Sequence, residues 1–303
     1  MKPGPLPPAR RYTIGAAAFE AENLAPGLYI VATPIGNLGD MTIRALATLA
    51  AADVILCEDT RTTAKLLERY GIRNRLEPYH EHNAAKARPY IIARLKEKAA
   101  IALVSDAGMP LVNDPGYRLV VEAQAAAVAI TCCPGPSAVF AALALSGLPT
   151  DRFGFFGFVP HKQGERARLF TGLASLKSTL IFFESPHRII ETLQHLAQAL
   201  PGRAIVVARE LTKLHEEVLR GSASEIVASL AARPSVKGEI TLLIGPPAGT
   251  GERASEAEID RAIAEALKSS PTSKAASDVA RKLGLNRKDI YARILAAKND
   301  AQA

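Results

Sequence analysis

The 303-residue sequence contains no tryptophan, and aromatic residues make up only 5% of it. A binding surface built on stacked aromatic rings, as in many proteins that bind single-stranded nucleic acid, is therefore not expected. The sequence also lacks an apolar run long enough to cross a membrane, and its first eleven residues lack the apolar core of a signal peptide. We therefore expect no membrane-embedded segment.

Cysteine is scarce as well, with three residues, Cys57, Cys132 and Cys133. They form neither a CxxC pattern nor a cluster with histidine, so the sequence predicts no metal site. Each lies in or at the end of an apolar run, where thiols are usually small core residues. This pattern is typical of a reduced, cytoplasmic protein.

Positive charge is unevenly distributed along a chain whose formal net charge is +7. Residues 61–98 contain ten lysines and arginines but only four acidic residues. One interpretation is a solvated helical surface, and the other is a patch that binds a polyanion such as RNA. The candidate RNA contacts are Arg61, Arg73, Arg75, Lys86 and Arg88.

Short apolar runs alternate with helical periodicity from residue 27 onward, which predicts an α/β fold with a mostly parallel sheet. The expected divisions are a disordered arm (1–26), two α/β domains (27–148 and 149–246), a linker (247–254) and a helical domain (255–303). The spacing of Ala280, Gly284, Ile290 and Leu295 in this last domain resembles a helix-turn-helix, although a small helical bundle would show similar spacing.

Four loops of unusual composition follow predicted strands of the first domain, at residues 33–40, 58–62, 105–110 and 133–138. Ligands of open α/β sheets bind beyond the carboxyl ends of the strands. Asp106 directly follows a strand, where a carboxylate can accept hydrogen bonds from ribose hydroxyls or an ammonium group. Asp59 could instead simply cap a helix. None of these loops has the G-x-G-x-x-G pattern of a dinucleotide site.

The second half adds similar loops at residues 183–188, 209–213 and 237–241. A lone histidine such as His187, near a helix start, is more often part of the scaffold than a catalyst. The glutamates could likewise be paired with nearby arginines. Each of these motifs is weak by itself.

Taken together and in order, the loops resemble those of the tetrapyrrole-methylase family of methyltransferases, over roughly residues 27–244. Within it they are most similar to the branch that 2′-O-methylates a cytidine of 16S ribosomal RNA. The motifs that carry the resemblance are GLYIVATPIGNL (27–38), CEDTR (57–61), SDAGMP (105–110), PGPS (134–137), FESPHR (183–188) and RELTK (209–213). The C-terminal helices fit this branch and are absent from plain tetrapyrrole methylases.

The resemblance implies a class III methyltransferase fold, with S-adenosylmethionine held in the cleft between two α/β domains, and a homodimer. It also implies a set of donor-binding residues: Pro34, Asp106, Gly108, Met109, Pro110, Ser137, Ala138, Phe183, Leu211, Gly238, Glu239 and Ile240. The implied substrate is 16S rRNA, alone or within the 30S subunit.

A ribose 2′-hydroxyl is a weak nucleophile, so a nearby base would assist methyl transfer. The candidates are Glu58, Asp59, Glu184 and His187. Two rival functions share parts of the pattern. A porphyrinogen C-methyltransferase would need the same fold and donor but not the basic stretch, and a non-enzymatic helix-turn-helix protein would leave the donor loops unexplained.

Overall fold

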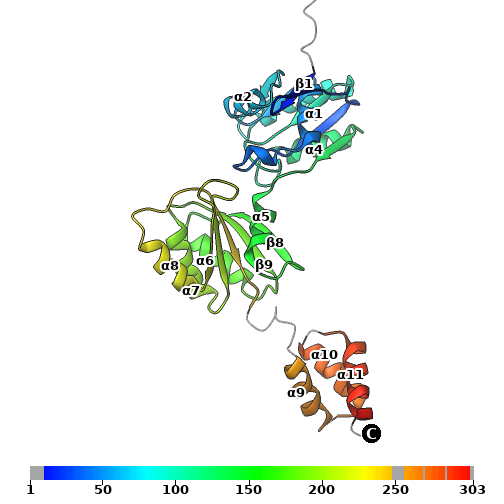
Figure 1. Ribbon diagram of the computed structural model, residues 1–303, viewed down its shortest axis with the longest axis vertical. Helices are drawn as coiled ribbons and strands as arrows, with labels where there is room; N and C mark the ends of the chain where they lie inside the picture. Colours follow the sequence, from blue (N-terminus) through cyan, green and yellow to red (C-terminus); the bar gives the residue numbers. More distant parts are fainter. Residues whose placement is uncertain (1–9, 248–255, 269, 284, 301–303) are drawn as a thin grey trace, which may run out of the picture.

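The computed structural model describes residues 10–247, 256–268, 270–283 and 285–300, arranged as two α/β domains and a helical unit (Figure 1). Parts of the expected arm (1–9) and nearly all of the expected linker (248–254) lie outside the described residues. Within the described residues, no helix combines the length and the apolar character needed to span a bilayer.

The first domain is built on a five-stranded parallel sheet, as the alternating apolar runs predicted. Its strand order is β5 (Leu76–Pro78), β4 (Val54–Cys57), β6 (Ala100–Leu103), β3 (Gly27–Val31) and β7 (Ile130–Cys133). Helices α1 (Ile43–Ala51) and α2 (Thr60–Arg69) cover one face, and α3 (Ala84–Lys96) and α4 (Tyr117–Ala125) cover the other. Because both faces are covered, β3 is buried along its whole length.

The expectation of a disordered arm before residue 27 is wrong for residues 11–20. Strands β1 (Arg11–Ile14) and β2 (Ala17–Glu20) form an antiparallel hairpin. Tyr12 stacks on Phe19, with ring centroids 5.3 Å apart, and is buried in the core beside α1. The backbone N–H of Thr13 also donates to the Tyr70 carbonyl at 2.7 Å. Contacts with the distant helices α1 and α2 therefore order this segment.

The second domain contains a mixed sheet with the order β11 (Glu217–Gly221), β10 (Ile205–Arg209), β12 (Ile240–Ile244), β9 (Thr179–Glu184) and β8 (Phe153–Phe158). Only β8 and β9 are parallel. Helices α6 (Gln163–Leu173), α7 (Ile189–Ala199) and α8 (Ala223–Ala231) pack on one face around a single apolar core.

Helix α5 (Ala138–Ser146) precedes the expected domain boundary at residue 148 but packs on the other face of the second sheet (Figure 1). Val139, Ala142 and Leu143 contact sheet residues of the second domain. The Arg220 side chain from β11 donates to the carbonyls of Leu145 and Ser146 at the end of α5. Helix α5 thus joins the two domains, and the structural boundary lies before it.

The C-terminal unit comprises α9 (Glu256–Leu267), α10 (Thr272–Leu283) and α11 (Arg287–Asp300). They share a small core that includes Ile263, Val279, Ile290 and Ile294. The Asn286 side chain accepts a hydrogen bond from the Lys288 N–H at 2.9 Å and so caps the N-terminus of α11.

Candidate active site

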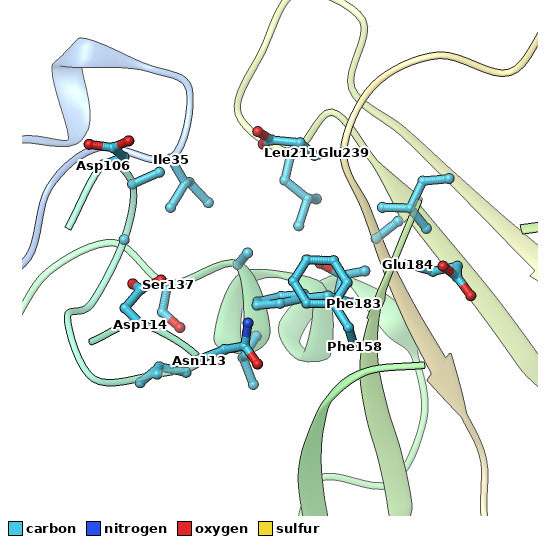
Figure 2. Close-up of a pocket in the computed structure, with 18 of the residues that line it drawn as sticks. Ile35, Asp106, Asn113, Asp114, Ser137, Phe158, Phe183, Glu184, Leu211 and Glu239 are labelled. Carbon is cyan, nitrogen blue, oxygen red and sulfur yellow. The ribbon is translucent and has the colours of Figure 1, made fainter. Parts of the chain in front are cut away.

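A cavity of about 420 Å³ lies between the two α/β domains, where the carboxyl ends of the parallel strands face the second sheet (Figure 2). Its size is in the range of small-molecule and cofactor sites. Every predicted donor contact except Pro34 and Pro110 lines it: Asp106, Gly108, Met109, Ser137, Ala138, Phe183, Leu211, Gly238, Glu239 and Ile240. Loops separated by more than 100 residues in sequence therefore converge on one cavity.

The loop after β6 forms the first-domain wall of this cavity. Gly108 has φ +82° and exchanges two backbone hydrogen bonds with Thr33, at 2.9 and 3.0 Å. Leu111 and Asn113 also have positive φ, at 71° and 69°. Left-handed backbone at residues other than glycine is costly and collects at functional sites. The loop is thus held in a specific shape that brings its backbone to the cavity.

The loop after β10 forms the opposite wall and points Leu211 into the cavity (Figure 2). Lys213 binds Glu210 at 2.9 Å and Glu239 at 3.0 Å, which joins this loop to the segment before β12. Gly238 has φ +93° and packs so closely on Glu210 that a Cβ would lie 2.3 Å from the Glu210 Cγ. Any larger residue at position 238 would therefore displace this wall.

The charged side chains that line the cavity all have the same sign. Among the described residues that line it, every charged side chain is acidic: Glu58, Asp106, Asp114, Glu184 and Glu239. No described group of His, Cys, Asp and Glu side chains is arranged to hold a metal ion. The cavity therefore suits an organic ligand with positive charge.

Glu58, directly after β4, is one of two predicted catalytic candidates that line the cavity, and Glu184 is the other. Burial, and then the negative charges of Asp114 and Asp106, raise the pKa of the Glu58 carboxyl group to about 7. Burial also raises the pKa of Asp114. Asp106 is anchored differently, because its Oδ1 accepts the Asp59 N–H at 3.2 Å. Glu58 can therefore exchange a proton near neutral pH.

The acidic candidates Asp59 and Glu184 occupy different environments. Asp59 caps α2, and its hydrogen bonds with Arg61 lower its carboxyl pKa to about 2. The Glu184 side chain is fully buried, and its carboxylate pairs with Arg188 and accepts the Thr192 hydroxyl at 2.6 Å. Because these interactions occupy both carboxylates, the structure does not support either residue as a base.

His187 is exposed and does not line the cavity. Pro34 lies outside the cavity too, on a neighbouring hollow beside α2, because the loop after β3 turns its Ile35 inward instead (Figure 2). Pro110 does not line the cavity, which Met109 and Val112 reach from the same loop. Pro34 and Pro110 therefore do not line the cavity, and their contacts with the donor remain predictions.

The basic residues of the 61–98 stretch separate into two groups. Arg88 has a side chain only 13% exposed, paired with Glu122 at 2.7 Å, so the structure contradicts its prediction as a surface RNA contact. Arg75 pairs with Glu77 and Arg61 with Asp59. Arg73 and Lys86 are exposed, and within the described part of the chain neither has an ion-pair partner. Arg61, Arg73, Arg75 and Lys86 all remain predicted RNA contacts, because all four are exposed.

Several cavity residues are not among the predicted site residues, for example Asn113, Asp114 and Phe158. The Asn-Asp-Pro-Gly run at 113–116 is a visible turn signal. Phe158, the last residue of β8, was not predicted because it follows a register shift between Phe155 and Phe158. Such an irregularity has no signal in an alternating apolar pattern.

Comparisons with known proteins agree with this geometry. Residues 27–227 match the family described as Tetrapyrrole (Corrin/Porphyrin) Methylases, and residues 253–298 match the RsmI C-terminal HTH domain. Ribosomal RNA small subunit methyltransferase I of Mesorhizobium japonicum is 47% identical, covering 94% of this chain and 97% of the relative. The protein of that name from Erythrobacter litoralis is 50% identical, covering 92% and 98%. A crystal structure of diphthine synthase superimposes with a TM-score of 0.57 at 16% identity, covering 72% and 89%.

Proposed function

Because the chain belongs to the tetrapyrrole methylase family, and within it to the ribosomal RNA small subunit methyltransferase I group, we propose that it transfers a methyl group from S-adenosylmethionine to the 2′-hydroxyl of a cytidine in 16S ribosomal RNA. Its substrate would be the small ribosomal subunit, and its site of action the cytoplasm.

The observation that carries the proposal is the acidic cavity between the domains. S-adenosylmethionine has a sulfonium and an ammonium group, and the carboxylates of Asp106 and Asp114 complement that charge. Apolar side chains from both domains, among them Ile35 and Leu211, suit the adenosyl moiety. When bound, the donor supplies an activated methyl group and a thioether that leaves readily.

The protein's main contribution would be alignment, because methyl transfer requires the ribose oxygen, the methyl carbon and the sulfur in line. The braced loops after β6 and β10 provide rigid walls for that alignment. Glu58 would accept the proton of the 2′-hydroxyl, since a carboxylate with a pKa of about 7 is ionised to a useful extent at neutral pH. Glu58 is the candidate base whose carboxylate no arginine neutralises among the described residues.

We also propose that the protein is a homodimer. Large apolar side chains are exposed on α4 (Tyr117, 72%, and Val121, 43%), on α5 (Phe140, 62%) and on the edge strand β8 (Phe153, 40%). Phe140 and Phe153 pack edge to face with ring centroids 5.8 Å apart, and Gly157 of β8 packs on Asn113 before α4. A second copy covering this surface would remove its apolar area from water.

RNA binding would combine the exposed cations Arg73 and Lys86 with the C-terminal helices. Phosphate contacts of this kind position an RNA but do not specify its sequence. The helical unit would add recognition of folded RNA by shape.

The decisive experiment incubates the protein and labelled S-adenosylmethionine with purified 30S subunits or with naked 16S rRNA. The modified RNA is digested to nucleosides and identified by mass spectrometry. We expect 2′-O-methylcytidine, and much less of it with the Asp106→Ala variant when the donor concentration is below saturation. A methylated base, or transfer only to a tetrapyrrole, would contradict the proposal.

A further inference from the structure

A second hollow lies beside the donor cavity and shares Asp106 with it. We call it the side hollow. One wall is the loop after β3, with Pro34 and Leu38, and the other is the first half of α2, with Thr62 and Lys65. Its volume is about 390 Å³. It is therefore large enough for a nucleoside and opens beside the cavity that suits the methyl donor.

Hydrogen bonds hold the walls of the side hollow in place. The Thr33 hydroxyl donates to the Ser105 carbonyl at 3.1 Å, which joins the loop after β3 to the loop after β6. At the far end, the Tyr70 hydroxyl at the end of α2 donates to the Leu38 carbonyl. Gly36 packs against Lys213 of the second domain so closely that a Cβ would lie 2.4 Å from the Lys213 Cγ. These contacts hold the walls of the side hollow in place before any ligand binds.

The chemistry of the walls is mixed in a way that suits a nucleotide. Pro34 and Leu38 offer apolar surface to a base, and Thr62 offers a hydroxyl. Lys65 is exposed at the rim, and in the described part of the chain no acidic side chain pairs with it. By contrast, all charged residues of the donor cavity are acidic. The side hollow therefore has a positive charge at its rim, which the donor cavity lacks.

A line of positive charge leads away from the side hollow along α2. Arg61, Lys65 and Arg69 are spaced four residues apart, so they lie along one side of the helix at intervals of about 6 Å. All three are exposed. Glu68, the acidic residue of this helix, lines a different hollow, with Ala64 and Gly71. Glu68 follows Lys65 by three residues and so lies next to it on the helix surface, although no ion pair joins the two among the described residues.

We infer that the side hollow receives the target nucleoside of a single-stranded or extruded RNA segment, and that Lys65 and the α2 cations hold the adjoining phosphates. The inference rests on the proposed function and adds the acceptor subsite to it. A nucleoside seated there would present its ribose beside Asp106, at the boundary with the donor cavity. A nucleotide that is paired within an RNA duplex could not enter, so the target base must first leave the base stack.

The first test fills the side hollow. Thr62→Phe places a ring in it, whereas the matched control Ala64→Phe places one in the hollow on the other side of the same helix. We expect Thr62→Phe to lower kcat/KM for 30S subunits by at least about tenfold, with the Kd for S-adenosylmethionine unchanged. Ala64→Phe should retain the wild-type values for both.

The second test removes the rim charge. Each phosphate contact with single-stranded nucleic acid contributes about 0.7 to the log–log salt slope, which corresponds to about fivefold in affinity at 0.1 M salt relative to 1 M. Lys65→Ala should therefore raise the KM for 30S subunits about fivefold at 0.1 M salt and reduce the slope by about 0.7. Lys177→Ala, an exposed lysine of the second domain, is the control and should change neither.

The outcomes separate this inference from the proposed function. If the wild-type protein methylates 30S subunits but Thr62→Phe does so equally well, the side hollow is not the acceptor subsite. If Thr62→Phe abolishes S-adenosylmethionine binding, the side hollow belongs to the donor site and the inference is again wrong. If the wild-type protein transfers no methyl group to 30S subunits or 16S rRNA, the proposed function itself fails.

Discussion

Replacing Glu58 by glutamine tests the proposed base directly, because glutamine keeps the size of the side chain but cannot ionise. In the wild-type protein the carboxyl pKa is about 7, raised by burial and by the charges of Asp114 and Asp106. The ionised fraction then rises from about 9% at pH 6 to about 91% at pH 8. If ionised Glu58 accepts the ribose proton, the single-turnover rate rises about tenfold over that interval.

The Glu58→Gln variant should lose this rise and, at pH 8, about 10²- to 10⁴-fold of the rate. Asp114→Asn provides a second, independent perturbation. It removes a charge that raises the pKa of Glu58, so the rising limb of the pH profile should move to lower pH. The assay is single-turnover methyl transfer to 30S subunits with saturating donor, measured between pH 5.5 and 8.5 in steps of about half a unit.

His187→Gln is the control, because His187 is an exposed titratable residue outside the cavity. It should keep both the rate and the pH profile of the wild-type protein. A Glu58→Gln variant that retained the wild-type rate and the tenfold rise would refute Glu58 as the base. Alignment alone would then account for catalysis.

Three further predictions concern the donor, the appendage and the dimer. Asp106→Ala should weaken S-adenosylmethionine binding by roughly 10- to 100-fold, because a hydrogen bond to a charged group is worth about 1.5–3 kcal/mol. Calorimetry measures this affinity, and an unchanged value with a normal circular dichroism spectrum would remove Asp106 from the site. Removal of residues 252–303 should leave donor binding intact but reduce methylation of 30S subunits, because the helical unit has its own core. If calorimetry shows that donor binding is lost, the helical unit is instead part of the core fold. Phe140→Glu should weaken dimerisation by at least about 100-fold, because burying each of two phenylalanines contributes about 1.5–3 kcal/mol. A dimer dissociation constant that sedimentation velocity finds equal to that of the wild-type protein would place the interface elsewhere.

The parallel sheet and the edge that carries the ligand loops could be predicted from the sequence alone. Buried parallel strands are continuous apolar runs, and each run ends where a polar loop begins. The position of Asp106 just after such a run therefore sufficed to predict that its loop lies at this edge of the sheet, where it lines the cavity. The order of the N-terminal segment could not be predicted in this way, because the hairpin at residues 11–20 depends on Tyr12 packing beside α1.

The ranking of the acidic candidates was decided only by the tertiary structure. Glu58, Asp59 and Glu184 all lie at or just after strand ends and have the same chemistry in the sequence. In the fold, Asp59 pairs with Arg61 and Glu184 with Arg188. Glu58 instead meets Asp106 and Asp114, which come from a loop about 50 residues away in the chain.

The contact between the domains was decided in the same way. Sequence periodicity identifies α5 as an apolar helix but does not say which sheet it covers. The structure places it on the second sheet, with Arg220 bonded to its last carbonyls. A pattern of residues specifies which side chains must be buried and where strands end. Which charges and surfaces meet depends on contacts between distant segments, and these form only when the whole chain has folded.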